Sequence, residues 1–284
     1  MPVLVQHLIR GAVLAPLKRP GADRAVPAEP VVADGVRVAA GRLDAYREVC
    51  GFAAGGGTLP VTYPQVLAFA PSMRLMSSWR FPLPLPGLVH TSLEIRQSRD
   101  LGTGEEYALA VRVAGLTPHR RGTEAHLVTE VRAAGEPVWQ SRSTYLARHA
   151  TPSEGPAPGH AAAPGTADGS APPLPRRAEW RLGGDLGRRY AAVSGDRNPI
   201  HLHPLTARAF GFPRAVAHGM WSVARCLAEH GGTRGPVRIT ARFLRPVLLP
   251  ATVAYAAEGA AFALRGGADG ARPHVTGEVR PLDR

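Results

Sequence analysis

A carboxylate and an imidazole lie five residues apart in the segment Ser194-Gly195-Asp196-Arg197-Asn198-Pro199-Ile200-His201. Five residues separate two side chains by about 140° on a helix, and an odd separation puts them on opposite faces of a strand. Asp196 and His201 can therefore meet only across a turn, which Asn198-Pro199 favours because the residue before proline avoids the helical region. Together they could hold one water molecule and move its protons. The alternative is that Asp196 caps a turn and His201 is a surface histidine.

A glycine stands eighteen residues further on, where an apolar helix over 220–229 is predicted to begin. The first N–H groups of a helix have no acceptor within it, and the helix dipole is positive there. Gly219 could therefore present its N–H to a developing oxyanion, because no Cβ would obstruct a substrate carbonyl. The alternative is a glycine that packs against a strand. Ser194 could form a hydrogen bond near the turn between Asp196 and His201, or it could simply cap that turn.

Each half of the chain combines one apolar helix with alternating strands. Residues 65–77 are apolar on nearly all sides, which predicts a buried helix that Pro71 should kink or delimit. Apolar residues alternate with polar ones over 109–113, 125–131 and 237–243, which predicts half-buried strands.

The segment 151–175 is rich in Pro, Gly and Ala, which predicts a linker between a domain at 1–150 and a second at 176–284. Tyr46-Arg-Glu-Val-Cys-Gly51 aligns without gaps with Tyr190-Ala-Ala-Val-Ser-Gly195 and suggests a duplication. Phe52 occupies the position that corresponds to Asp196, and no Asn-Pro-x-His follows it. The first domain should therefore be noncatalytic.

The composition, with 44% hydrophobic and 20% charged residues, is typical of a globular protein. The chain has no uninterrupted apolar run of membrane-spanning length and only two cysteines, so we expect a cytoplasmic protein with no membrane span and no disulfide framework. The net charge of +12 comes almost entirely from arginine, with Lys18 as the only lysine. No recognition motif accompanies this charge, so nucleic acid is an unlikely partner. A phosphate-bearing ligand or an acidic carrier protein would suit the surface equally well.

The motifs together resemble the MaoC-like acyl dehydratases, the (R)-specific enoyl-CoA hydratases also called hydratase 2. The resemblance covers most of 180–255 and is carried by Tyr190-x-x-Val-Ser-Gly-Asp-x-Asn-Pro-Ile-His201, Gly211-Phe212, Ala217-His-Gly-Met220 and Arg242-Phe-Leu-Arg-Pro-Val247. In the first half, Tyr63-Pro64, Gly87-Leu-Val-His90, Ile95-Arg-Gln97 and His119-Arg-Arg-Gly122 are similar to the two-domain 3-hydroxyacyl-thioester dehydratases of actinobacteria.

The resemblance implies an α+β double hotdog, in which two antiparallel sheets join edge to edge and each wraps around a central helix. It also implies reversible addition of water to a trans-2-enoyl thioester, giving a (3R)-hydroxyacyl thioester. Asp196 and His201 become the catalytic pair, Asn198 the organiser of water or turn, and Gly219 N–H the oxyanion donor. The reaction needs no metal and no cofactor beyond the coenzyme A or phosphopantetheine of the substrate. The sequence does not divide the two proton transfers between Asp196 and His201.

Further expectations concern substrate and assembly. Arg242 and Arg245, with Arg120-Arg121, could meet coenzyme A phosphates or an acidic acyl carrier protein, although a solvated surface is the default reading. The first half could accept a long acyl tail beside Ala68 and Ala70, or it could merely complete the sheet. The chain could form a homodimer. A hotdog thioesterase and a noncatalytic acyl-thioester-binding subunit are the alternative functions.

Overall fold

The structure is a computed structural model that describes residues 15, 18, 20–151, 174–231, 233–267 and 270–282. Most of the predicted linker, from 152 to 173, lies outside these described residues. None of the helices in the described ranges is long and apolar enough to cross a membrane.

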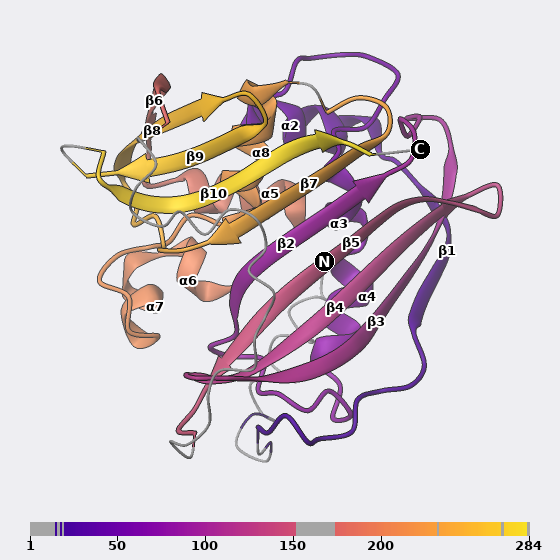
Figure 1. The fold of residues 1–284 in the computed structure, drawn as a ribbon, viewed down its shortest axis with the longest axis vertical. Helices are drawn as coiled ribbons and strands as arrows, with labels where there is room; N and C mark the ends of the chain where they lie inside the picture. The colour runs from indigo at the N-terminus through magenta and orange to yellow at the C-terminus, as the bar shows by residue number, and fades with distance from the viewer. Residues whose placement is uncertain are drawn as a thin grey trace.

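Helices and strands from both halves contribute to one α+β architecture (Figure 1). The elements before the linker segment are β1 (Val31–Arg37), α2 (Ala40–Cys50), α3 (Tyr63–Leu67), α4 (Phe69–Met76), β2 (Val89–Gln97), β3 (Glu106–His119), β4 (Gly122–Ala133) and β5 (Glu136–Arg148). Those after it are β6 (Arg176–Leu182), α5 (Leu186–Ser194), α6 (Pro199–Leu202), α7 (Pro204–Ala209), α8 (Gly219–His230), β7 (Val237–Phe243), β8 (Ala251–Glu258), β9 (Ala261–Gly266) and β10 (Arg272–Pro281).

The strands form one ten-stranded antiparallel sheet in the order β1-β3-β4-β5-β2-β7-β10-β9-β8-β6. Five strands come from each half, and the halves join where β2 pairs with β7, from Ser92 opposite Arg242 to Gln97 opposite Val237. The helices α2, α3, α4, α5 and α8 lie behind the face of the sheet that is turned to the viewer (Figure 1). This arrangement confirms the predicted double hotdog.

The helix predicted over 65–77 is broken into α3 and α4, which meet at Ala68. Pro71 explains the position of the break. Proline has no N–H to donate, and its ring collides with the carbonyl four residues earlier, which here belongs to Leu67, the last residue of α3. The helix predicted over 220–229 is α8, which buries Val223, Cys226 and Leu227 against the sheet core.

The duplicated segments form α2 and α5, which pack against each other. Both helices end at a glycine in the left-handed region, Gly51 at φ 77° and Gly195 at φ 85°, a conformation that glycine adopts without steric cost. Arg42 Nε donates to the Val193 carbonyl oxygen at 2.6 Å across this contact. Trp221 Nε1 of α8 donates to the Val49 carbonyl oxygen at 2.8 Å. The two halves therefore share a continuous core.

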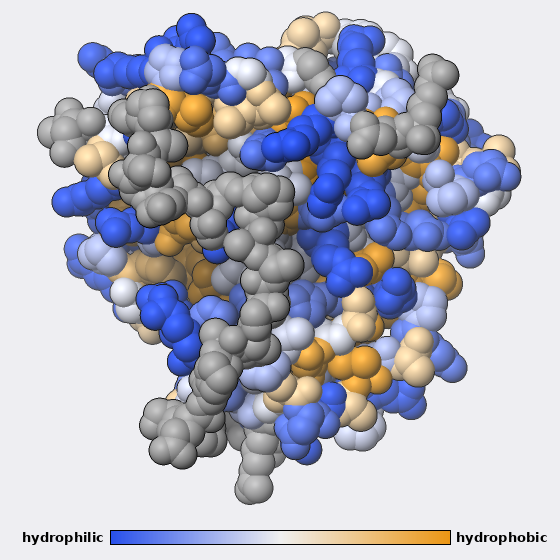
Figure 2. All heavy atoms as spheres, in the orientation of Figure 1, coloured by the Kyte–Doolittle hydropathy of each residue, from blue (hydrophilic) through white to orange (hydrophobic). Residues whose placement is uncertain are grey.

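The face of the sheet opposite the helices is strongly polar. Figure 2 shows hydrophilic side chains gathered over the middle of this face, where β5, β2 and β7 run side by side. Exposed arginines there are Arg96, Arg142, Arg238 and Arg242. Glu94 pairs with Arg96 at 2.6 Å and with Arg238 at 3.2 Å, so part of the positive charge is neutralised within the sheet.

Candidate active site

The segment that follows α5 is a series of turns held by its own polar side chains. Ser194 Oγ accepts the Asp196 N–H at 3.1 Å, and Asp196 Oδ1 accepts the Asn198 N–H at 3.1 Å. Asn198 Oδ1 in turn accepts the Ile200 N–H at 3.4 Å and caps α6, whose first residue is Pro199. Each side chain thus bonds the backbone two residues ahead, the pattern by which Ser, Asp and Asn form turns. The result is a bend between Asp196 and His201.

This bend brings Asp196 and His201 together. One ligand atom from each lies within 4.8 Å of the other. The His201 ring is buried, whereas the Asp196 side chain retains 30% of its exposure, so the pair lies at the boundary between core and solvent. Neither a helix nor a strand could place side chains five residues apart in this way.

His201 has a defined tautomer. Its Nδ1 lies 2.6 Å from the Val216 carbonyl oxygen, which can only accept, so Nδ1 carries the proton and Nε2 keeps a lone pair. Burial lowers the pKa of His201 below its usual value, and the nearby negative charge of Asp196 only partly opposes this shift. The ring is therefore neutral at pH 7, and Nε2 can act as a base.

His218, which sequence reasoning did not assign to the site, is the third member of the cluster. Its ring stacks on His201 with centroids 3.7 Å apart, and its Nε2 donates to the Asp196 carbonyl oxygen at 2.9 Å. Burial, and then the neighbouring His201, lower the pKa of His218 to about 3, so it is neutral. The Tyr190 ring also packs against His218, with ring centroids 4.8 Å apart. His218 thus fixes both the bend and the base. The sequence signal was its place directly before Gly219 in Ala217-His-Gly-Met220.

The loop before α8 is anchored on two sides. The Val216 N–H donates to the Ile200 carbonyl oxygen at 3.0 Å, and the Ala217 N–H donates to the Val247 carbonyl oxygen at 2.9 Å. These bonds tie the loop to α6 and to the segment after β7. They place the first residue of α8 beside the bend between Asp196 and His201.

Gly219 is that first residue, so its N–H lacks an acceptor within the helix. A Cβ at this position would lie 2.9 Å from Phe243 Cε1, closer than side chains normally approach. Packing of the β7 aromatic ring is therefore one sufficient reason for glycine here, in keeping with the alternative raised from the sequence. The oxyanion role also requires a residue without a side chain, so the glycine is compatible with both interpretations.

The first half contains a different structure where the second has the bend between Asp196 and His201. Phe52 packs on Tyr46 with ring centroids 6.2 Å apart. The following glycine loop is held by the buried Arg47, whose Nη2 donates to the carbonyl oxygens of Gly56 at 3.1 Å and Thr58 at 2.9 Å. A buried guanidinium that binds carbonyls replaces the acid and base.

The remaining predicted residues lie in several environments. Ala68 is fully buried between α3 and α4, whereas Ala70 is exposed. Arg242 points to the polar face of the sheet, opposite the face that Phe243 occupies, because neighbouring residues alternate along β7. Arg245 is exposed beyond the end of β7. Arg120 and Arg121 form the turn between β3 and β4. The structure thus brings Ser194, Asp196, Asn198, His201 and Gly219 into one region and leaves both Arg242 and Arg245 outside it.

Asp196, His201 and His218 are also the residues that could hold a metal ion, since their ligand atoms lie within 4.8 Å of one another. His218 Nε2, which faces Asp196, donates its proton to a carbonyl oxygen, so it has no lone pair for a metal. The bonding therefore suits proton transfer better than coordination. His203 lies outside this cluster, and its Nδ1 accepts the Leu205 N–H at 3.1 Å.

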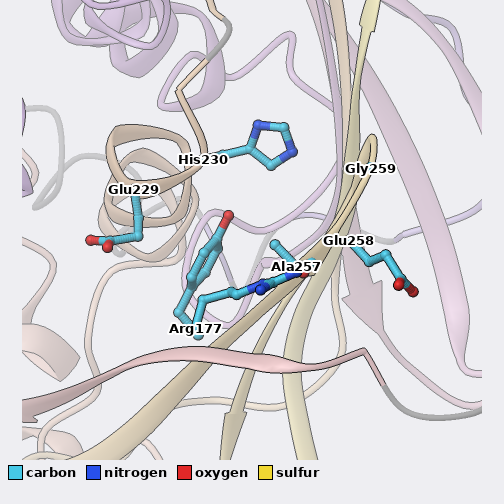
Figure 3. A pocket seen from close by; sticks show the side chains of 7 residues that line it. Arg177, Glu229, His230, Ala257, Glu258 and Gly259 are labelled. Carbon is cyan, nitrogen blue, oxygen red and sulfur yellow. The ribbon is translucent and has the colours of Figure 1, made fainter.

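A separate cavity of about 330 Å³ lies at the opposite end of α8, about 16 Å along the helix from Gly219. Figure 3 shows its lining, where the carboxylates of Glu229 and Glu258 point to opposite sides, away from His230. The two carboxylates of this cavity therefore do not converge with His230 as Asp196 and His201 do at the other end of the helix.

The fold and the acid–base cluster define a double hotdog protein with a site suited to proton transfer. Comparisons with known proteins agree. A family model for the MaoC like domain matches residues 173–265. The 3-hydroxyacyl-thioester dehydratase X of Mycobacterium tuberculosis is 36% identical over 287 residues, 99% of either chain. The chain belongs to the MaoC-like dehydratase family.

Solved structures agree in fold. The crystal structure of HtdX from Mycobacterium tuberculosis superposes with a TM-score of 0.76 at 34% identity and covers 89% of this chain and 100% of its own. A MaoC-like dehydratase from Phytophthora capsici has a TM-score of 0.67 at 18% identity and covers 92% of this chain and 96% of its own. A Mycobacterium tuberculosis protein described as having a double hotdog fold has a TM-score of 0.58 at 16% identity. The match covers 90% of this chain and 96% of that protein. The latter two show the fold alone.

Proposed function

We propose that the chain is a 3-hydroxyacyl-thioester dehydratase that interconverts trans-2-enoyl and (3R)-hydroxyacyl thioesters. The observation that carries this proposal is the position of Asp196 and His201 at most 4.8 Å apart across one bend, beside the start of α8. The similarity to 3-hydroxyacyl-thioester dehydratase X over almost the whole chain supports the choice of reaction.

The geometry suits one water molecule. The Asp196 carboxylate and the His201 Nε2 lone pair are both acceptors, so one water can donate an O–H to each. Two hydrogen bonds of about 2.8 Å each can bridge ligand atoms that lie within 4.8 Å of one another. In the hydration direction the water oxygen bonds to C3, and a proton passes through this pair to C2. Dehydration reverses these steps, and the pair ends in its starting state.

The thioester carbonyl gains negative charge while the C2–H bond forms or breaks. The Gly219 N–H at the start of α8 would stabilise that charge, which is worth about 2.7–4 kcal/mol for a single donor in other enzymes. The first half, with Phe52 and the Arg47-bound loop in place of the acid and base, would be noncatalytic and would receive the acyl tail.

The test is incubation of the full chain with crotonyl-CoA and with a longer trans-2-enoyl-CoA, while enoyl absorbance, free thiol and product chirality are measured. We expect loss of absorbance without release of thiol and formation of the (3R) product. Release of free thiol would instead identify a thioesterase. No change with either substrate would contradict the proposed activity.

A further inference from the structure

Three aromatic rings from three neighbouring strands stack in series across the seam between the halves. Phe243 of β7 lies 4.5 Å from His90 of β2, measured between ring centroids, and His90 lies 4.6 Å from Tyr145 of β5 at an interplanar angle of 17°. His90 and Tyr145 are directly opposite each other in the β2–β5 register. Two of the rings belong to the first half and one to the second.

One end of this stack contacts the catalytic helix. Phe243 Cε1 would lie 2.9 Å from a Cβ on Gly219, so the ring packs directly on the start of α8. At the other end, Gln65 Nε2 of α3 donates to Ser143 Oγ, two residues from Tyr145 on the same face of β5, at 3.3 Å. Tyr145 interacts with the Ser143 side chain and with the charge of Asp196, so the stack runs from the backbone at Gly219 to residues beside the bend and the helical layer of the first half.

His90 takes part as a neutral ring. Burial lowers the pKa of His90 to about 4, and a hydrogen bond with the Ser92 backbone opposes this shift only in part. Its Nε2 is buried and has no hydrogen-bond partner within the described part of the chain. It is stacked on Tyr145 and lies tilted against Phe243, so both neighbouring rings pack directly on the imidazole.

We infer that His90 and Tyr145 are positioning residues for the reaction: they hold the Phe243 ring at Gly219 and so define the gap in which the thioester carbonyl lies. This inference rests on the proposed function. It gives the noncatalytic half a part in placing the reacting group, separate from any contact with the acyl tail. The contact is at the thioester end, so its loss should affect short and long substrates equally.

The variants His90→Ala and His90→Phe separate the contribution of the aromatic ring at position 90 from that of the imidazole nitrogens. A shift of the reacting group by about 1 Å can lower the rate of an enzyme by about a hundredfold. We expect His90→Ala to lower kcat by about tenfold to a hundredfold with crotonyl-CoA and with a longer enoyl-CoA, while KM changes by less than about threefold. His90→Phe keeps an aromatic ring and should recover kcat to within about threefold of the original chain.

His126→Ala is the matched control, because His126 lies on neighbouring β4 with its side chain on the opposite face of the sheet, bonded to Thr117 and Thr144. It should leave kcat unchanged. If His90→Ala does not fold, as judged by circular dichroism and thermal unfolding, Tyr145→Leu tests the same stack and should lower kcat in the same chain-length-independent way.

An unchanged kcat in the folded variant would overturn the inference. So would a kcat for His90→Phe as low as that of His90→Ala, which would assign the role to the nitrogen, or a loss that grows with chain length, which would indicate a tail contact. An original chain with no hydration activity would refute the proposed function itself, and this result is distinct from the other three.

Discussion

The chemistry of His201 is set by a single backbone carbonyl. The bond from Nδ1 to Val216 leaves Nε2 as an acceptor, and burial keeps the ring neutral. His218 supports the same arrangement from the other side, since it stacks on His201 and bonds the Asp196 backbone. Replacing either acceptor of the proposed water should therefore abolish its activation, and Asp196→Asn keeps an Oδ1 that can still accept the Asn198 N–H of the bend.

Asp196→Asn and His201→Ala should each lower kcat by at least about a hundredfold in a folded protein, because positioned acid–base groups contribute about 10²–10⁴-fold. Asp185→Asn and His203→Ala are matched controls, since both side chains are exposed and lie outside the cluster. Steady-state kinetics with crotonyl-CoA is the measurement. Near-normal turnover in both catalytic variants would refute the assignment.

The activity should persist into mildly acidic solution. Protonation of His201 removes the Nε2 lone pair, and burial has moved its pKa below the usual 6.5. As pH falls, kcat/KM should therefore stay constant to about pH 6.5 and decline only below it. A pH profile measured with crotonyl-CoA checks this. A decline that is half complete at or above pH 6.5 would contradict the neutral, buried base.

At the scale of elements, the start of α8 is determined by the strand beside it. Ala is usually better than Gly within a helix by about 0.5–1 kcal/mol. At Gly219, however, the Cβ would meet the Phe243 ring at 2.9 Å. The steric contact should outweigh the helical preference there.

Gly219→Ala should consequently destabilise the protein by about 1–3 kcal/mol, the usual cost of overpacking, and lower kcat, because Phe243 or the helix start must move. Gly41→Ala in α2 is the control, since no atom lies within 4 Å of its Cβ position, and it should be neutral or stabilising. Urea unfolding measures both changes. Recovery of stability in the double variant with Phe243→Leu would identify the ring as the cause, and a Gly219→Ala protein as stable as the Gly41→Ala protein would contradict it.

The break between α3 and α4 bears on the acyl tail. Enlarging the fully buried Ala68 to Leu should lower kcat/KM for a long enoyl-CoA more than for crotonyl-CoA, if the tail lies beside these helices. Ala70→Leu extends into solvent and should change neither value. The ratio of kcat/KM for the two substrates is the measurement. An equal loss for both substrates in Ala68→Leu would favour a purely structural first half.

At the scale of the whole molecule, three neutral histidines lie close to the seam between the halves: His201 and His218 are buried, and His90 is half-buried with a buried Nε2. Burial lowers the pKa of His90 to about 4 and that of His218 to about 3, and it also lowers the pKa of His201. In the unfolded chain these rings titrate near 6.5. The unfolded state therefore binds more protons than the folded state as the pH falls below that value.

The free energy of unfolding should accordingly be greatest above pH 6.5 and decrease as the pH falls toward 4. His90 alone accounts for roughly 3 kcal/mol of this loss, since each pKa unit corresponds to about 1.4 kcal/mol. Urea unfolding at a series of pH values checks the prediction. In a folded His90→Phe variant the decrease should be smaller by about that amount. The same dependence of the unfolding free energy on pH in both proteins would show that His90 is not held neutral in the folded state.

The elements with strong periodicity could be predicted from the sequence. Residues 237–243 form β7 and 220–229 lie within α8, because alternation and an apolar run followed by glycines specify these structures locally. The break at Ala68 could be placed only approximately, since Pro71 acts on a carbonyl four residues earlier. The position of His218 before Gly219 did not reveal its role, because that role depends on a stacking partner seventeen residues away in the chain.

The sequence by itself determined the bend between Asp196 and His201, because Ser194, Asp196 and Asn198 each bond a backbone group only two residues away. It also determined which half retains the acid and base, since Phe52 cannot move a proton. The tertiary structure alone decided the protonation of His201, the packing of Phe243 on Gly219, and the contact of His90 and Tyr145 with that ring. These features join residues that are distant in the chain, and only the pairing of β2 with β7 and the burial of the rings bring them together.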